Sequence, residues 1–477
     1  MRPFPPIRLF VTLPVIRTAE PPPGVRLPPV LGSPALAPAT PAVVRRAARV
    51  AVRLDLQQKL ACVLWAIILT DPQFWLQDFG LSILLRAPLV LTVALVLTLV
   101  SKPGKGDLLW VMVAWIMAMA INLPFSYDRG TMMTPLRTMI LFYVIGFAVV
   151  RGFRSPRAVA FALFMLCVGQ YLWWGVMGIK DGMVPWHPNL SNFDGYGPMM
   201  ACGVGPAYYY ANATRIRWRR TLALIASGMC VIGVVSAFAR GGVLALIATV
   251  IYIWIRSPNK ARTTGLMVAG FLLVVAASAL IDGQTRGDDT RSNFFDEMST
   301  MFDHSAGSTG DDRIHLWTAA IKVFKAHPVF GVGPDQFGPA AVTLIAPGEI
   351  QGAAFSDNPA TLYARALHSN YFEVLCEFGV VGSVIYLFMI GQFFQRSFYV
   401  VRHAARINLE AAGISDPRMI ELGLEAGMVA YLVSGIFFNQ LFTAWLYCLF
   451  FANALMYRFA RPASARDRSM TFRSGST

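Results

Sequence analysis

Three polar side chains in this hydrophobic chain have types and positions that suit chemistry on an anion. Arg240 lies where one apolar segment turns into the next, and Arg313 and His368 lie near the ends of one long polar stretch. An arginine near a membrane is costly without an anionic partner, and its planar guanidinium matches phosphate oxygens in pairs. A histidine titrates close to neutral pH, as a general base should. These residues predict a site for an anion and a reaction on it.

Composition indicates that these residues belong to an all-α polytopic membrane protein. Of the 477 residues, 56% are hydrophobic and 14% are charged, whereas roughly a quarter are charged in soluble proteins. Several apolar runs reach the roughly 17–25 residues that a helix needs to cross a bilayer. The net charge of +15 does not indicate nucleic-acid binding, because the basic residues lie in short loops and the aromatic residues mostly lie within spans. The six cysteines show no metal-ligand spacing.

About twelve transmembrane helices and one large outward loop with short helices are expected. The predicted spans are 58–74, 83–101, 107–124, 134–151, 157–177, 195–213, 220–238, 241–256, 263–281, 370–394, 421–438 and 441–458. The chain then divides into a disordered Pro/Arg-rich tail at 1–55, helices one to nine at 56–281, a loop or cap at 282–369, helices ten to twelve at 370–459, and a tail at 460–477.

Every second loop of this arrangement is basic. Arginine and lysine gather at 102–105, 151–157, 215–220, 256–262, 396–406 and 458–468. Such loops stay on the cytoplasmic side of a membrane, so both termini are expected to be cytoplasmic. Arg240, Arg313 and His368 then face the opposite compartment together.

Residues 313–324 are predicted to form a helix along the membrane surface. Ile314, Trp317, Ile321 and Phe324 recur at three- and four-residue spacing, which is typical of one apolar helix face. An aspartate at 311 or 312 is expected to cap the N-terminus and leave Arg313 in the first turn.

The chain resembles the O-antigen ligase and polymerase superfamily of bacterial envelopes. The resemblance rests on three motifs. The first is Ser236 to Gly242 (Ser-Ala-Phe-Ala-Arg-Gly-Gly), the second consists of Arg313, Trp317, Pro328, Gly331, Gly333 and Phe337, and the third is 367–371 (Leu-His-Ser-Asn-Tyr) with 377–379 (Glu-Phe-Gly). Pro188-Asn189 is a weaker match. Alanine stands where the family has serine before the arginine. One residue is inserted between His368 and Asn370, which leaves the role of Asn370 open.

The resemblance implies a glycosyltransferase of the bacterial inner membrane with a periplasmic active site. The donor would be a glycan on undecaprenyl diphosphate, and the acceptor a hydroxyl of lipid A core, another glycan or a protein, as in lipopolysaccharide or exopolysaccharide synthesis. Arg240 and Arg313 would bind the diphosphate, and His368 would act at the acceptor hydroxyl. His187, Asn189, Trp317 and Asn370 are further substrate-binding candidates. We expect no cofactor or metal, and inversion at the sugar carbon.

Several alternatives stay open at this point. Arg240 alone could be a membrane anchor, Arg313 could pair with an aspartate, and His187, His304, His315 and His327 compete with His368 for the role of base. The acidic run at 288–312 could bind a divalent metal. A polymerase of carrier-linked repeats or a protein O-oligosaccharyltransferase would share the donor site, and a transporter of lipid-linked glycans is the alternative from another class.

Overall fold

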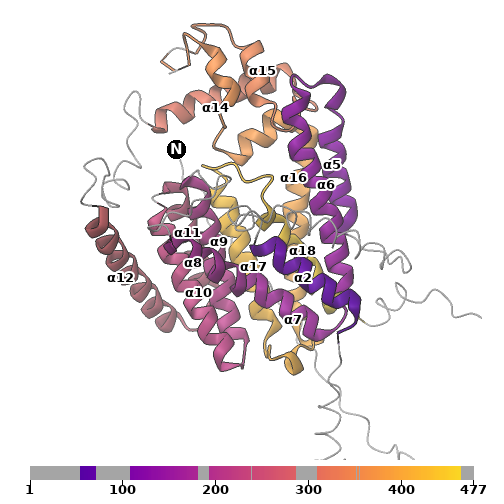
Figure 1. Cartoon of the computed structure of the whole chain (residues 1–477), viewed down its shortest axis with the longest axis vertical. Helices are drawn as coiled ribbons and strands as arrows, with labels where there is room; N and C mark the ends of the chain where they lie inside the picture. The colour runs from indigo at the N-terminus through magenta and orange to yellow at the C-terminus, as the bar shows by residue number, and fades with distance from the viewer. Residues whose placement is uncertain are drawn as a thin grey trace, which may run out of the picture. The chain divides into compact units, whose positions relative to one another are not determined.

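The computed structural model describes residues 54–70, 108–180, 193–237, 239–285, 309–350, 352–353 and 355–462. Within these ranges the chain is helical, and its β-structure is limited to one isolated bridge between Thr214 and Ile414 (Figure 1). The helices are α2 (Leu56–Thr70), α5 (Leu108–Ala120), α6 (Arg129–Gly152), α7 (Pro156–Phe164), α8 (Gln170–Lys180), α9 (Phe193–Ala213), α10 (Arg217–Ser236), α11 (Arg240–Arg256), α12 (Lys260–Thr285), α14 (Thr309–Ala326), α15 (Phe337–Leu344), α16 (Asn370–Arg402), α17 (Pro417–Ser434) and α18 (Ala444–Ala460).

Each predicted span coincides with one of these helices, except 83–101, which lies outside the described residues. The helix over the predicted span 157–177 contains a π-helical turn, Met165–Gly169, between α7 and α8. Four described stretches are long and apolar enough to cross a membrane: Arg129–Gly152, Pro156–Val176, Arg217–Ser236 and Asn370–Arg402. The protein is therefore a helical membrane protein, and the number of spans stays a prediction.

The centre of the bundle is built by close packing of α9 against α17. A Cβ built on Gly205 of α9 would lie 2.3 Å from Ala426 Cβ, and one on Gly427 of α17 would lie 3.0 Å from the Cys202 carbonyl oxygen. Small residues allow such backbone approach in helical membrane proteins, where van der Waals packing supplies much of the association energy.

The two ends of the bundle differ in chemistry. At one end, Arg458 of α18 donates to the carbonyls of Val150 in the last turn of α6 and of Phe153 just after it. Arg215 lies 2.5 Å from Glu410, which follows α16. We call this the basic end, because the predicted basic loops 151–157, 215–220 and 396–406 all lie there. The helices α11 and α16 begin at the other end, which we call the site end.

The described part of the polar stretch, residues 309–369, forms a cap with its own hydrophobic core. Leu316, Ala319 and Val323 of α14 pack there with residues of α15, including Phe337 and Ala341. The predicted 313–324 helix is part of α14, and Ile314 and Ile321 of its apolar face are exposed, so the contact of this face with a membrane stays a prediction. Against the cap the helix buries a different face, which includes small alanines. The prediction of Asp311 or Asp312 as the helix cap is wrong, because α14 begins at Thr309 and holds both in its first turn.

Candidate functional site

The cap is joined to the bundle where α16 breaks its helical conformation. Gly379 has φ +61° inside α16. The break frees backbone groups of α16 on both sides of Gly379. Before it, the Cys376 carbonyl accepts from the Val332 N–H (3.2 Å), and the Glu377 carbonyl accepts from the Gly333 N–H (2.7 Å). After it, the Val380 N–H donates to the Pro328 carbonyl (2.9 Å). The segment 328–333 therefore pairs with α16 through backbone hydrogen bonds.

The Glu377 carboxylate reinforces this junction. Its two oxygens accept from the N–H groups of Asp335 (2.8 Å) and Phe337 (3.2 Å). Gly331 is required by the same geometry, because its φ is +70° and a Cβ would lie 2.3 Å from the Glu377 carbonyl oxygen. The motif residues 328–337 and 377–379 are thus the two halves of one structural joint, which their separation in the sequence concealed.

His368 lies just before α16 in a left-handed backbone conformation with φ +51° and is half-buried. On its N-terminal side, the Trp317 indole N–H donates to the Leu367 carbonyl (3.0 Å). On its C-terminal side, the Ser369 N–H donates to Asn439 Oδ1 (2.8 Å). The imidazole is therefore carried on a short segment fixed at both flanking residues.

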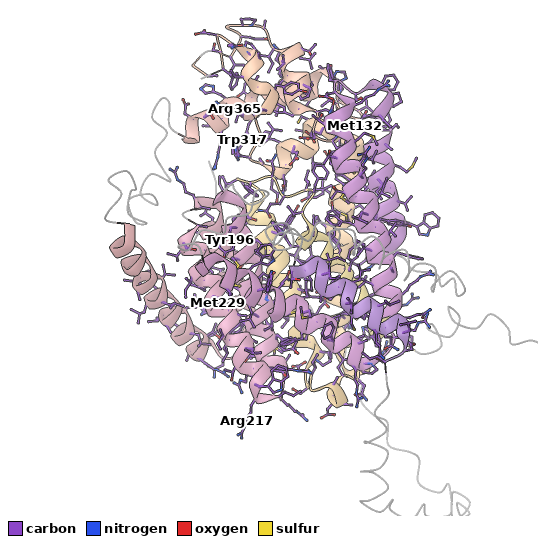
Figure 2. All side chains as sticks on the ribbon, in the orientation of Figure 1. Met132, Tyr196, Arg217, Met229, Trp317 and Arg365 are labelled. Atoms are coloured by element: carbon purple, nitrogen blue, oxygen red, sulfur yellow. The ribbon has the colours of Figure 1, made fainter. Side chains whose placement is uncertain are left out.

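Trp317 has a positioning role in this arrangement. Its ring stacks on Phe372 of α16 with centroids 4.9 Å apart and planes 16° apart, while its N–H fixes the carbonyl next to His368. Arg313 lies one helical turn before Trp317 and is also half-buried, so α14 brings Arg313 to the side of the cap that faces the start of α16. Figure 2 labels Trp317 on this helix.

Asn370 is completely buried, and the protein itself uses its polar groups. Its backbone N–H donates to Gly435 (2.8 Å), its side-chain oxygen accepts from the Gln440 N–H (2.5 Å), and its Nδ2 donates to Tyr431 (3.1 Å). These contacts attach the start of α16 to residues 435–443, the α17–α18 loop. These bonds let Asn370 support the segment that carries His368, and its contact with substrate stays a prediction.

The same α17–α18 loop lies against the turn that carries Arg240. A Cβ on Gly241 would lie 3.3 Å from Phe437 Cβ, and one on Gly242 would lie 2.9 Å from the Gly197 carbonyl carbon of α9. The two glycines that follow Arg240 thus let α11 start in tight contact with α9 and the loop. Arg240 is the first residue of α11 and is half-buried.

Both aspartates in the first turn of α14 contact basic side chains. Asp312 lies 2.6 Å from Arg365 Nη1, and Asp311 lies 3.4 Å from His315 Nε2. These contacts connect α14 to the segment just before His368 and give His315 a structural partner. Figure 2 labels Arg365 on the cap.

The loop between α5 and α6 also docks on the cap. Asn122 Nδ2 donates to the Phe330 carbonyl (2.7 Å), the Asp128 N–H donates to Gln336 Oε1 (2.7 Å), and Tyr363 hydrogen-bonds to the Asp128 carboxylate. The bond from Tyr363 lowers the pKa of Asp128, with a smaller contribution from the Gly130 N–H. This loop therefore shares the site end with the cap, as predicted for two outward segments.

The structure tests the competing histidines unequally. His327 lies 2.9 Å from the Tyr127 hydroxyl through Nε2, which is a structural contact at the docking loop. His187, Asn189 and His304 lie outside the described residues, as does the acidic run apart from Asp311 and Asp312. Among the residues that the structure describes, no three His, Cys, Asp or Glu side chains form a metal-binding group.

The arrangement defines a class before any comparison: a helical membrane protein with two arginines and a histidine at one end, where a cap joins a broken helix. Residues 222–387 match the family model described as O-Antigen ligase. This match confirms the resemblance to the O-antigen ligase superfamily, and it spans Arg240, Arg313, Trp317, His368 and Asn370. It supports a membrane role of the glycan ligase or polymerase type. No curated protein matches the chain.

Proposed function

We propose that this protein is an inner-membrane glycosyltransferase that moves a glycan from undecaprenyl diphosphate to an acceptor hydroxyl on the periplasmic face. One observation carries the assignment of the site. The α17–α18 loop contacts both the turn that holds Arg240 and the segment that holds His368, and Trp317 connects the helix of Arg313 to that same segment. The elements that carry the three residues are therefore connected through one loop and one tryptophan, which supports a single site.

The two arginines suit the donor. Cleavage of a sugar–diphosphate bond sends the bonding electrons to the departing diphosphate, which gains negative charge. Guanidinium groups stay charged at all relevant pH values and bind phosphate oxygens in pairs. Removal of one donor that stabilises such charge commonly costs about 3–4 kcal/mol of transition-state energy. The diphosphate of a lipid carrier lies at the membrane surface, where α11 begins with Arg240.

His368 suits the acceptor. As the acceptor oxygen forms its bond to C1 of the sugar, its proton passes to the imidazole, and the bond from C1 to the diphosphate oxygen breaks. One displacement of this kind inverts the anomeric carbon and needs no metal. The fixed backbone on both sides of His368 supports this role, because a general base must keep hydrogen-bond distance to the hydroxyl.

Complementation in the native bacterium tests the proposal. Deletion of the gene should remove or shorten a surface glycan ladder, and wild type should restore it. Arg313→Ala and His368→Ala should fail to restore it at normal protein level, while Arg217→Ala at the basic end should succeed. An unchanged ladder on deletion, or full rescue by either site variant, would contradict the proposal.

The same gel separates ligase from polymerase. A ligase defect leaves full-length chains on the carrier and none on the acceptor. A polymerase defect leaves single repeat units on the acceptor.

A further inference from the structure

The basic end of the bundle contains a cavity that the proposed reaction does not use. It has a volume of about 350 Å³ and lies between the last turns of α16, the residues just after it, and α18. Its wall includes Arg396, Arg402, His403, Tyr399 and Tyr457, together with two glutamines. His368 precedes the first turn of the same helix, so the length of α16 separates this cavity from the candidate site (Figure 1).

The charge around this cavity is one-sided. Among the described residues that line it, none carries a carboxylate. Arg396 is 5% exposed, and its guanidinium lies 5.5 Å from the Tyr457 ring centroid. The guanidinium of Arg461 lies 5.9 Å from the centroid of the same ring, and Arg406 donates to the Tyr399 hydroxyl at 3.4 Å.

Three carboxylates of neighbouring elements have partners of their own, while Oε2 of Glu421 is buried without a hydrogen bond to the described residues. Glu425 of α17 accepts from Ser397 (2.5 Å) and lies 3.4 Å from Arg256. Glu410 lies 2.5 Å from Arg215, and Glu421 accepts from Asn453 (2.6 Å). The cavity therefore combines a concave shape with an excess of cationic and hydrogen-bond-donating groups, which suits a phosphate.

An exposed apolar stripe leads along α16 to this cavity. Val380, Val384, Leu387, Phe388 and Phe398 are each more than half exposed. Val380, Val384, Leu387 and Phe388 follow one another by four, three and one residues, and Phe398 follows Leu387 by eleven, about three helical turns, so the five lie on one face. Arg402 follows Phe398 by four residues on that face. An apolar stripe that ends in a basic cavity fits an acyl chain followed by a charged headgroup.

We propose that this cavity binds the phosphate of an anionic phospholipid headgroup, with an acyl chain along the exposed face of α16. The lipid would be a stable partner of the protein at the end opposite the glycan site. Free inorganic phosphate offers the same charged group without the chain, so it is the source against which the lipid must be compared.

Binding can be measured by native mass spectrometry on the full-length protein after removal of lipid in detergent. Phosphatidylglycerol and cardiolipin should bind at least about tenfold more tightly than phosphatidylethanolamine. The double variant Arg396→Gln/Arg402→Gln should lose this preference. Because Arg396 is buried and its replacement can impair folding, Arg402→Gln alone, at an exposed position, should weaken anionic lipid binding several-fold with an unchanged unfolding temperature.

Arg217→Gln/Arg220→Gln provides the matched control. It removes the same charge from the same end, and Figure 2 shows Arg217 pointing away from the bundle. This control should retain wild-type lipid preference. Three results would each overturn the proposal. The first two are equal binding of all three lipids, and equal lipid binding by wild type and Arg402→Gln. The third is an unfolding temperature that rises with inorganic phosphate and does not change with lipid.

Discussion

His368 adopts the left-handed backbone conformation, which is uncommon for residues other than glycine, although asparagine, aspartate and histidine adopt it more often than most. Such a conformation costs on the order of 1–3 kcal/mol and persists only where surrounding contacts impose it. Here Trp317 fixes the preceding carbonyl, and Asn439 fixes the following N–H. Local strain at a residue with suitable chemistry is consistent with a functional constraint on the direction of the imidazole.

This geometry suggests a substitution that separates chemistry from backbone. Asparagine tolerates the left-handed conformation but cannot take the proton. His368→Asn should therefore reduce transfer by about 10²–10⁴-fold, while the unfolding temperature stays that of wild type. Transfer can be followed in membranes with the native donor and acceptor. A wild-type rate in this variant would remove His368 from the role of base.

The two arginines can be tested by substitution with lysine, which replaces the planar guanidinium with a single ammonium group. Arg240→Lys and Arg313→Lys should each lower transfer by about 10²-fold, because lysine keeps the charge but loses the paired hydrogen bonds. Arg217→Lys, at the exposed end of α10, is the control and should transfer normally. An undiminished rate in Arg240→Lys would favour the membrane-anchor interpretation of that residue.

At the scale of elements, the junction between the cap and α16 depends on Gly379. A Cβ at this position would lie 2.5 Å from the Val329 carbonyl oxygen, and φ is +61°. Gly379→Ala should destabilise the junction by about 1–3 kcal/mol and raise amide exchange in 328–337. Gly391→Ala on the same helix is the matched control, because a Cβ there meets nothing within 4 Å. Equal exchange in the two variants would contradict the role assigned to the junction.

The contact between the α5–α6 loop and the cap should depend on pH. The folded pKa of Asp128 is lowered by Tyr363, so the stability that this carboxylate contributes is present above its unfolded pKa, near 4, and is lost as pH falls through the lower folded value. The protection factors of the amides at 359–364, which correct for the intrinsic pH dependence of exchange, should therefore stay constant from about pH 7 to pH 5 and fall only below about pH 4. Asp128→Asn should abolish the acid-dependent step. An unchanged step in that variant would assign it to another group.

Sequence reasoning located the helices well and the contacts between them poorly. Apolar run length predicts a helix such as α16 because burial in lipid needs a continuous apolar segment. The pairing of 328–333 with 376–381 is invisible to such reasoning, since it consists of backbone hydrogen bonds between segments far apart in the chain. The same limit applies to Asn370, because the sequence does not indicate its complete burial or its bonds to the α17–α18 loop.

The whole molecule has two chemically different ends, and the sequence predicted this because its basic loops alternate. The hydrogen bonds of Arg458 and the ion pair of Arg215 indicate that these loops share one end. At the other end lie the α5–α6 loop with Asn122, the start of α16 with Asn370, and the start of α11 with Gly241. The direction of the molecule in the membrane follows only from the distribution of positive charge, because packing is unaffected by which side faces the cytoplasm.

Cysteine labelling from one side of the membrane tests that direction. All six natural cysteines are buried, so the unmodified chain should label weakly with a membrane-impermeant maleimide. Tyr363→Cys on the cap, where the side chain is 49% exposed, should label in intact spheroplasts, whereas Arg217→Cys at the basic end should label only after permeabilisation. The opposite pattern would place the glycan site in the cytoplasm and exclude a periplasmic reaction. Labelling of both positions in intact spheroplasts would contradict the two-ended arrangement itself, since no membrane would then separate His368 from the basic cavity.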